Sequence, residues 1–251
     1  MLLLNPEQHR DLHLTPIDNG WLALGQGAIP LVFDDLQTLK GRCPVVISQR
    51  GTPLPLLLPE LIQRYQSASW GGFTPKALKP YPLRLIRQPV LAAGDTQLEY
   101  RESLMIDESS PHLQLRTGYR LFEDDGQLTA FTQEKIQQLR AFESELQQVQ
   151  QLMQQLDDIG ALAPVRVLYQ GETIDCRLIH RERLNAALGQ LDSLEAGYHV
   201  VFLAEALLQA QDCLDVDQVH WMEESDSAHY KPSRSAVRKA MLNNDDGEVD
   251  R

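Results

Sequence analysis

The chain has 251 residues, of which 43% are hydrophobic and 23% charged, so it can bury a sizeable core without disulfides or metals. Its 23 basic and 35 acidic residues give a formal net charge of −12, which repels phosphate backbones and anionic lipid headgroups. No run of basic residues offsets this charge, so we expect no nucleic-acid partner and no membrane insertion.

The cysteines and the N-terminal sequence indicate the compartment. Cys43, Cys176 and Cys213 are widely separated and form no CxxC pair, which excludes a zinc knuckle and a dithiol redox motif. The first residues lack the basic start and the apolar stretch of a signal peptide, and no segment approaches the ~18 apolar residues of a membrane span. The sequence therefore predicts a cytoplasmic protein with reduced thiols.

Short apolar runs separated by prolines fill the first ~120 residues and predict an irregular, β-rich half of the chain. Pro53, Pro55 and Pro59 lack the amide donor that a strand ladder needs, so we expect no regular ladder among them. The runs that read best as strands are residues 45–47, 83–86 and 98–106.

A stretch without proline or glycine from Thr132 to Asp158 predicts one long amphipathic helix. Thr132 is the expected N-cap, and Gly160 is the expected residue after the C-terminus. Apolar residues recur in alternating steps of three and four, which predicts one buried face that packs mainly within the same chain. This face consists of Leu139, Phe142, Leu146, Val149, Met153 and Leu156.

Three further elements are expected after the long helix. Alternating apolar residues over 165–178, interrupted at Gly171, predict a β-hairpin. A short amphipathic helix is expected at 183–191. Residues 198–208 are apolar nearly all round, which predicts a helix buried on several sides.

These elements together predict an α+β fold. We expect an irregular β-rich N-terminal half packed with a long amphipathic helix, a β-hairpin and a buried C-terminal helix. After Met222 the chain becomes acidic and poor in aromatic residues. We therefore expect a single domain over residues 1–222 and an acidic, flexible tail over residues 223–251.

Six short motifs follow one another along the chain: NPEQHRDL (5–12), AIPL (28–31), CPVV (43–46), PYP (80–82), LFEDDG (121–126) and LNAA (184–187). In this order they resemble the SapC family of bacterial proteins, over roughly residues 5–220. The chain departs from the family pattern between Ser48 and Pro75, where the family usually has a strand and a turn and this chain has the proline-rich residues 53–56. The family brings no established catalytic residues. It implies work beside outer-membrane receptors, cupin-like proteins and halogenase-like flavoproteins, in nutrient uptake or modification.

His9 and His13 are the candidate metal ligands, with Asp11 between them. Residues four apart share a face of a helix, so both rings could converge on one ion. A metal site needs at least a third ligand, and the sequence does not identify one. The alternative is a polar N-terminal segment that docks on the body of the protein.

Trp70 and Phe73 are the candidate contacts with a partner protein. They flank Gly71 and Gly72 after a proline-rich run, and aromatic side chains on adaptable loops often anchor interfaces. The alternative is that Trp70 anchors the core.

Other patterns are weaker. Gly25 and Gly27 begin like a dinucleotide-binding loop, but Pro30 takes the place of the third glycine. Cys176 and His180 could pair as nucleophile and base, yet on a strand they would be ~13 Å apart, so a buried structural thiol is favoured. Paired acids such as those at 124–125 mark turns rather than catalytic sites.

The sequence therefore predicts a non-catalytic accessory protein without a cofactor. It would act through a partner protein, with a halogenase-like flavoprotein, a cupin-like protein or a receptor component as candidates. The alternative is an enzyme, possibly metal-dependent, whose site combines residues distant in sequence such as His9, Asp11 and a further histidine. Oligomeric state is left open.

Overall fold

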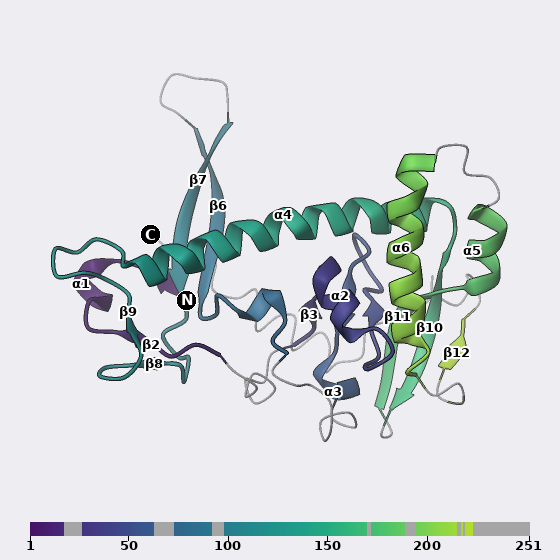
Figure 1. The fold of residues 1–251 in the computed structure, drawn as a ribbon, viewed down its shortest axis with the longest axis horizontal. Helices are drawn as coiled ribbons and strands as arrows, with labels where there is room; N and C mark the ends of the chain where they lie inside the picture. Colours follow the sequence, from purple (N-terminus) through teal and green to yellow (C-terminus); the bar gives the residue numbers. More distant parts are fainter. Residues whose placement is uncertain are drawn as a thin grey trace, which may run out of the picture.

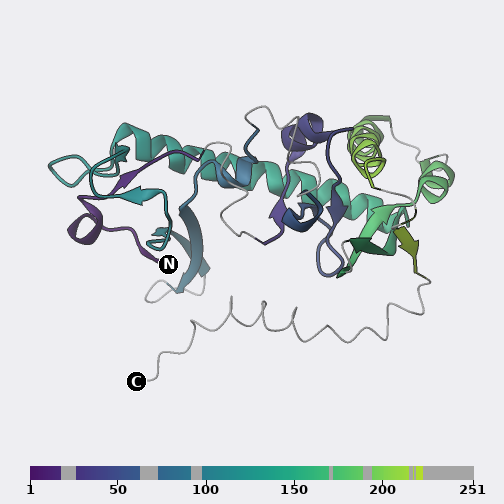
Figure 2. The same ribbon diagram turned by 90° about the horizontal axis from the view of Figure 1, so that it is seen from below.

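The helix α4 (Ala130–Asp158) runs along most of the molecule and connects two lobes, as Figure 1 shows. Turning the view by 90° shows the same arrangement, with the lobes at opposite ends of α4 (Figure 2). The predicted α+β class is confirmed, since helices and antiparallel sheets contribute to both lobes. The computed structural model describes residues 1–17, 27–62, 73–91, 98–169, 172–188, 194–214, 217 and 219–222.

The long helix is confirmed, but its N-terminal cap is not the predicted one. The helix begins at Ala130, and the side chain of Thr129 accepts a hydrogen bond from the amide of Thr132. The hydroxyl of Thr132 instead donates to the carbonyl of Leu121, at 2.9 Å. The prediction failed because two threonines stand three residues apart and only their tertiary contacts distinguish them. At the other end, Gly160 has φ +70°, as expected of the residue that ends a helix.

The predicted apolar face of α4 is buried within this chain. Four of its six residues are at most 7% exposed, and Phe142 and Leu146 are half-buried against the main core. Predominantly intramolecular packing is therefore confirmed. The fully buried members are Leu139, Val149, Met153 and Leu156.

The N-terminal lobe holds two small antiparallel sheets and the helix α1 (Pro6–His9). Its core includes Leu14, Leu83, Ile106 and Leu121. One sheet has the order β1-β7-β6, with β1 (Leu2–Leu3), β7 (Leu98–Ile106) and β6 (Leu83–Leu91). The other has the order β8-β2-β9, with β8 (Leu113–Gln114), β2 (His13–Leu14) and β9 (Tyr119–Arg120).

The C-terminal lobe is built on a six-stranded sheet of order β12-β10-β11-β4-β5-β3. The predicted hairpin is confirmed as β10 (Leu162–Tyr169) and β11 (Glu172–Ile179). On the β11 side, the next strands come from the N-terminal half of the sequence, so that half divides between the lobes. On the β10 side, the neighbour is the C-terminal strand β12. The remaining strands are β12 (Val219–Trp221), β4 (Val46–Ile47), β5 (Pro55–Leu57) and β3 (Ile29–Pro30).

The expectation that the prolines exclude a regular ladder was wrong at Pro55. This residue is the first of β5 and pairs with Ile47 of β4. Proline lacks an amide hydrogen but keeps its carbonyl, and the carbonyl of Pro55 accepts from the amide of Leu31 at 3.0 Å. The first residue of a strand is a position that proline tolerates.

Helices cover this sheet and complete the main core. The predicted buried helix is α6 (Leu194–Gln211), which contributes Val200, Leu203 and Leu207 to the core. The expected helix at 183–191 is α5 (Arg181–Leu188). Among the described residues, none of the helices is long and apolar enough to cross a membrane. The other helices are α2 (Phe33–Leu39), α3 (Pro59–Ile62) and the short 3₁₀ helix η3 (Lys76–Leu78).

Candidate protein-binding surface

His9 lies at the end of α1 and is completely buried. Its Nδ1 is 3.0 Å from both the backbone nitrogen and the carbonyl oxygen of Asn5, and its Nε2 is 3.1 Å from Oε1 of Glu108. An imidazole held by a carboxylate resembles part of a catalytic triad. With no exposed surface, however, the ring has no contact with solvent, and its hydrogen bonds attach the N-terminal segment to the loop after β7.

His13 does not join His9 in a metal site. It lies on β2, and its Nδ1 is 3.0 Å from the backbone carbonyl of Asp11. The helical spacing assumed for His9 and His13 is absent, because α1 ends at His9 and does not continue to His13. Across the part of the chain that the structure describes, no group of three or more His, Cys, Asp or Glu side chains is placed to hold a metal ion.

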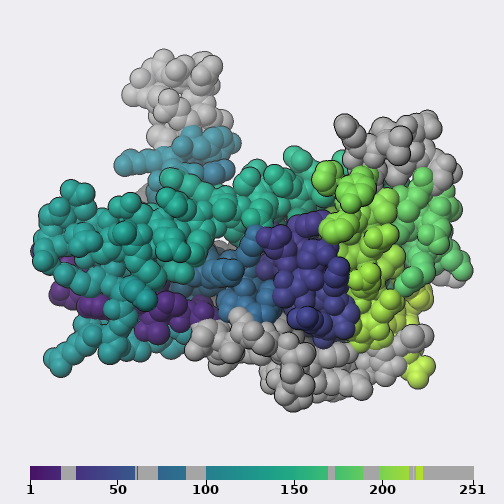
Figure 3. Space-filling model, in the orientation of Figure 1, coloured from purple at the N-terminus to yellow at the C-terminus, as the bar shows by residue number. Residues whose placement is uncertain are grey.

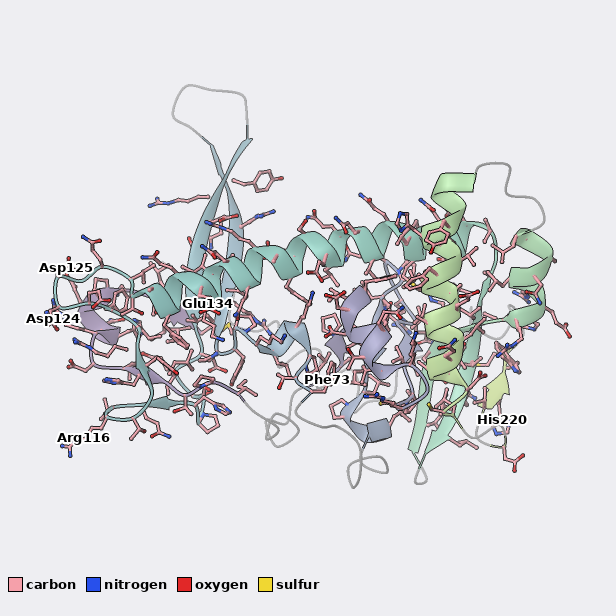
Figure 4. The ribbon with its side chains drawn as sticks, in the orientation of Figure 1. Phe73, Arg116, Asp124, Asp125, Glu134 and His220 are labelled. Atoms are coloured by element: carbon pink, nitrogen blue, oxygen red, sulfur yellow. The ribbon has the colours of Figure 1, made fainter. Side chains whose placement is uncertain are left out.

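The two aromatic residues proposed as a partner contact are only partly described. Trp70 lies outside the described residues. Phe73 is half-buried and packs against the main core. Figure 4 places it beneath α2, near the middle of the molecule. Core packing by Phe73 is therefore observed, while a role in partner binding stays a prediction.

The remaining candidates do not converge. Burial raises the pKa of the Cys176 thiol to about 12, so a reactive thiolate is disfavoured. The ring of His180 packs on Trp221, with centroids 4.9 Å apart. Asp124 and Asp125 lie at one end of the molecule and His220 at the other (Figure 4).

A stack of aromatic rings between α2 and α6 is the most distinctive surface feature. The Phe33 and Phe202 rings have centroids 5.0 Å apart and an interplanar angle of 25°. Tyr198 continues the stack from Phe202 at 6.3 Å and 19°. Residues 198 and 202 are four apart on α6 and therefore share one face of the helix. We call these three residues the aromatic ladder.

The ladder changes from buried to exposed along its length. Phe33 and Phe202 are half-buried, whereas Tyr198 is 67% exposed. Figure 3 shows α2 and α6 in contact on one face of the molecule. The exposed ring of Tyr198 is therefore supported by Phe202, and Phe202 by Phe33, and both phenylalanines are half-buried in the fold.

Two acidic side chains share a lysine near the start of α2, the helix that carries Phe33. Asp34 follows Phe33, and its side chain is 71% exposed. The Nζ of Lys76 donates to Asp34 at 2.6 Å and to both carboxylate oxygens of Glu145 at 2.8 Å. Burial alone would lower the pKa of Lys76, but these hydrogen bonds outweigh it and raise the pKa, so the ammonium stays charged. Two carboxylates and one ammonium leave a net negative charge. We call Asp34, Lys76 and Glu145 the acidic rim.

Asp35 fixes the position of this rim. Its carboxylate is 2% exposed and accepts the backbone amides of Lys76, at 3.1 and 3.4 Å, and of Val32, at 3.3 Å. Burial raises the pKa of Asp35 to about 6, although both amides lower it. The carboxylate thus connects η3 to the start of α2, directly beside Phe33.

Sequence reasoning missed the aromatic ladder. Tyr198 was assigned to a helix buried on several sides because its neighbours are apolar. The available signal was the pairing of Tyr198 with Phe202 at helical spacing. Their proximity to Phe33, far away in the sequence, arises only from the packing of α2 on α6.

Comparisons with known proteins give one match. A protein-family model described as SapC matches residues 4–192. No curated protein and no solved structure matches the chain. The matched segment includes Phe33, Asp34 and Lys76, and it ends before Tyr198 and Phe202.

Proposed function

The chain belongs to the SapC family, and from this premise we propose that it is a non-catalytic accessory protein that binds a partner protein through the aromatic ladder. The observation that carries the proposal is the exposure of Tyr198, which is 67% exposed although it stacks on Phe202, which in turn stacks on Phe33. In keeping with the family resemblance, we place this role in the cytoplasm of a bacterium, without a cofactor.

The stacked geometry suits an anchor for a partner. Tyrosine contributes a large, amphipathic contact area and has only two side-chain torsions to order on binding. The contact of its ring with Phe202 restricts these torsions before any partner arrives. A smaller part of the binding free energy is then spent on ordering the side chain.

The acidic rim indicates what the partner presents. Asp34 and Glu145 leave a net negative charge after pairing with Lys76, and the whole chain carries −12. Complementary potentials favour a partner segment with an apolar or aromatic side chain flanked by lysine or arginine. The resemblance to the family suggests a halogenase-like flavoprotein or a cupin-like protein as the bearer of that segment.

Isothermal titration of the full chain against each purified candidate from the same organism tests this proposal. We expect one of them to bind, and Tyr198→Ala to weaken its binding by at least about tenfold, as for a central aromatic anchor. Binding should also weaken as salt rises, because the rim is charged.

Tyr100→Ala is the matched control, since Tyr100 is also 67% exposed but lies on β7 in the other lobe. It should leave the affinity per binding site unchanged. If Tyr198→Ala binds as tightly as the wild type, or if neither candidate binds the wild type, the proposed surface or the proposed partner class is wrong.

A further inference from the structure

Strands β6 and β7 form a long hairpin that projects from the N-terminal lobe. Nine residue pairs connect them, from Leu83 opposite Ile106 to Leu91 opposite Leu98. Leu83 and Ile106 are buried in the core of that lobe, whereas the outer half of the hairpin extends beyond α4 (Figures 1 and 3). We call this hairpin the arm.

Ion pairs fix the arm against α4 where the two cross. Glu102 of β7 pairs with Arg87 of β6 at 3.0 Å and with Arg140 of α4 at 2.9 Å. Arg87 also reaches Glu143 of α4, at 3.3 Å. The arm is therefore held in a defined direction, although an isolated two-stranded hairpin is only marginally stable in water.

One edge of β7 is open beyond the short strand β1. The amide of Leu4 donates to the carbonyl of Leu104 at 2.8 Å, so the polar backbone groups of Leu104 face the β1 side. Because these directions alternate along a strand, the backbone groups of Glu102 and Tyr100 face the same side. No strand among the described residues pairs with β7 there, since β1 pairs only with Met105 and Ile106.

The outer edge of β6, by contrast, is interrupted. The amide of Asp107 donates to the carbonyl of Pro82, so residues 84, 86 and 88 of β6 bond towards β7. The odd-numbered residues of β6 then direct their backbone groups outwards, and one of them is Pro89, which has no amide hydrogen. Proline on an exposed edge is a common protection against strand pairing. The arm thus has one protected edge and one open edge.

We propose that the open edge of β7 pairs with the same edge of a second copy of this chain, antiparallel and centred on Tyr100. Tyr100 is 67% exposed and would lie opposite its equivalent, which forms an aromatic cross-strand pair. The result is a continuous four-stranded sheet across a two-fold axis, an isologous contact.

Charge selects this register. Residues whose backbone groups face the open edge must pair with one another across the contact, so the two-fold axis passes through a residue and not between two. Within this part of β7, that residue can be 99, 100, 101 or 102. Centring on 101 places Arg101 opposite Arg101, and centring on 99 or 102 places glutamate opposite glutamate. Centring on Tyr100 places Arg101 opposite position 99, a glutamate, twice across the axis. Arg101 is exposed and has no ion pair within the described part of the chain, so its charge is available.

Sedimentation equilibrium of the full chain over a range of concentrations tests the pairing. We expect the wild type to form a dimer and Arg101→Glu or Glu99→Arg to weaken it by about tenfold or more, because each change creates two like-charge contacts. The double variant with both changes exchanges the charges and restores both opposite-charge contacts. Its dimer constant should return to within about threefold of the wild type.

Arg84→Glu is the control, because Arg84 is an exposed arginine of the arm that is not on β7. It should leave the dimer constant unchanged. The proposal fails if the wild type stays monomeric at the highest reachable concentration, or if a single reversal leaves the dimer intact. It also fails if the double variant does not recover, or if Arg84→Glu weakens the dimer equally. None of these outcomes bears on the aromatic ladder, which lies elsewhere and is tested with a different partner.

Discussion

Asp35 should make the stability of this protein depend on pH between about 4 and 6. The carboxylate is 2% exposed, and burial raises its pKa to about 6 from the ordinary value of 3.8. A group whose pKa is higher in the folded state binds its proton more tightly there than in the unfolded chain. Folding is therefore favoured below pH ~4, and this contribution disappears as pH rises through ~6.

The difference between the two pKa values corresponds to about 3 kcal/mol, at about 1.4 kcal/mol for each pH unit. Asp35→Asn cannot ionise, and its amide oxygen can still accept the amide of Lys76. We therefore expect the free energy of unfolding of the wild type to fall relative to that of Asp35→Asn by about 2.5 kcal/mol between pH 4 and pH 7, since part of the full difference is already lost at pH 4. Urea denaturation of both proteins across this range measures the difference, and titrations common to both cancel.

Asp34→Asn controls for the loss of a negative charge beside Lys76, because the Asp34 side chain is 71% exposed and bonds to the same residue. A difference between wild type and Asp35→Asn that stays constant with pH would refute the reasoning. If the wild type instead gains stability relative to Asp35→Asn as pH rises, the amides of Lys76 and Val32 outweigh burial and stabilise the ionised form.

Three shorter predictions concern the fold. Met153→Ala should lower the free energy of unfolding by about 2–5 kcal/mol, because Met153 is fully buried in the core. Gln154 is exposed, so Gln154→Ala should change it by less than about 0.5 kcal/mol; chemical denaturation measures both. Gly118→Ala should melt well below the wild type, since φ is +110° and a Cβ would come within 2.6 Å of a backbone oxygen of β2. Gly41→Ala, with φ +66° and open space, should lose only about 1 kcal/mol. Truncation after Met222 should shift the melting temperature by only a few degrees, because acidic, apolar-poor segments contribute little to a core; a large drop would show that residues 223–251 dock on the body.

The sequence by itself determined the elements whose signals are local. Spacing of apolar residues on α4 reports one buried helical face, and alternation around Gly171 reports the β10–β11 hairpin. Both patterns reflect periodic burial within one segment, so no knowledge of the rest of the chain was needed. The capping residue of α4 could not be predicted from such local signals, because Thr129 and Thr132 differ only in their tertiary contacts.

Tertiary structure decided which segments meet. β4 and β5 join the hairpin β10–β11 across more than a hundred residues, a partnership that periodicity within a segment cannot specify. His9 is buried against Glu108, and Phe33 stacks on Phe202. Both contacts likewise join segments that are far apart in the sequence, so they depend on how the chain folds as a whole. The open edge of β7 was also hidden in the sequence, because the direction of each backbone amide follows from the pairing of β1 and β6 with that strand.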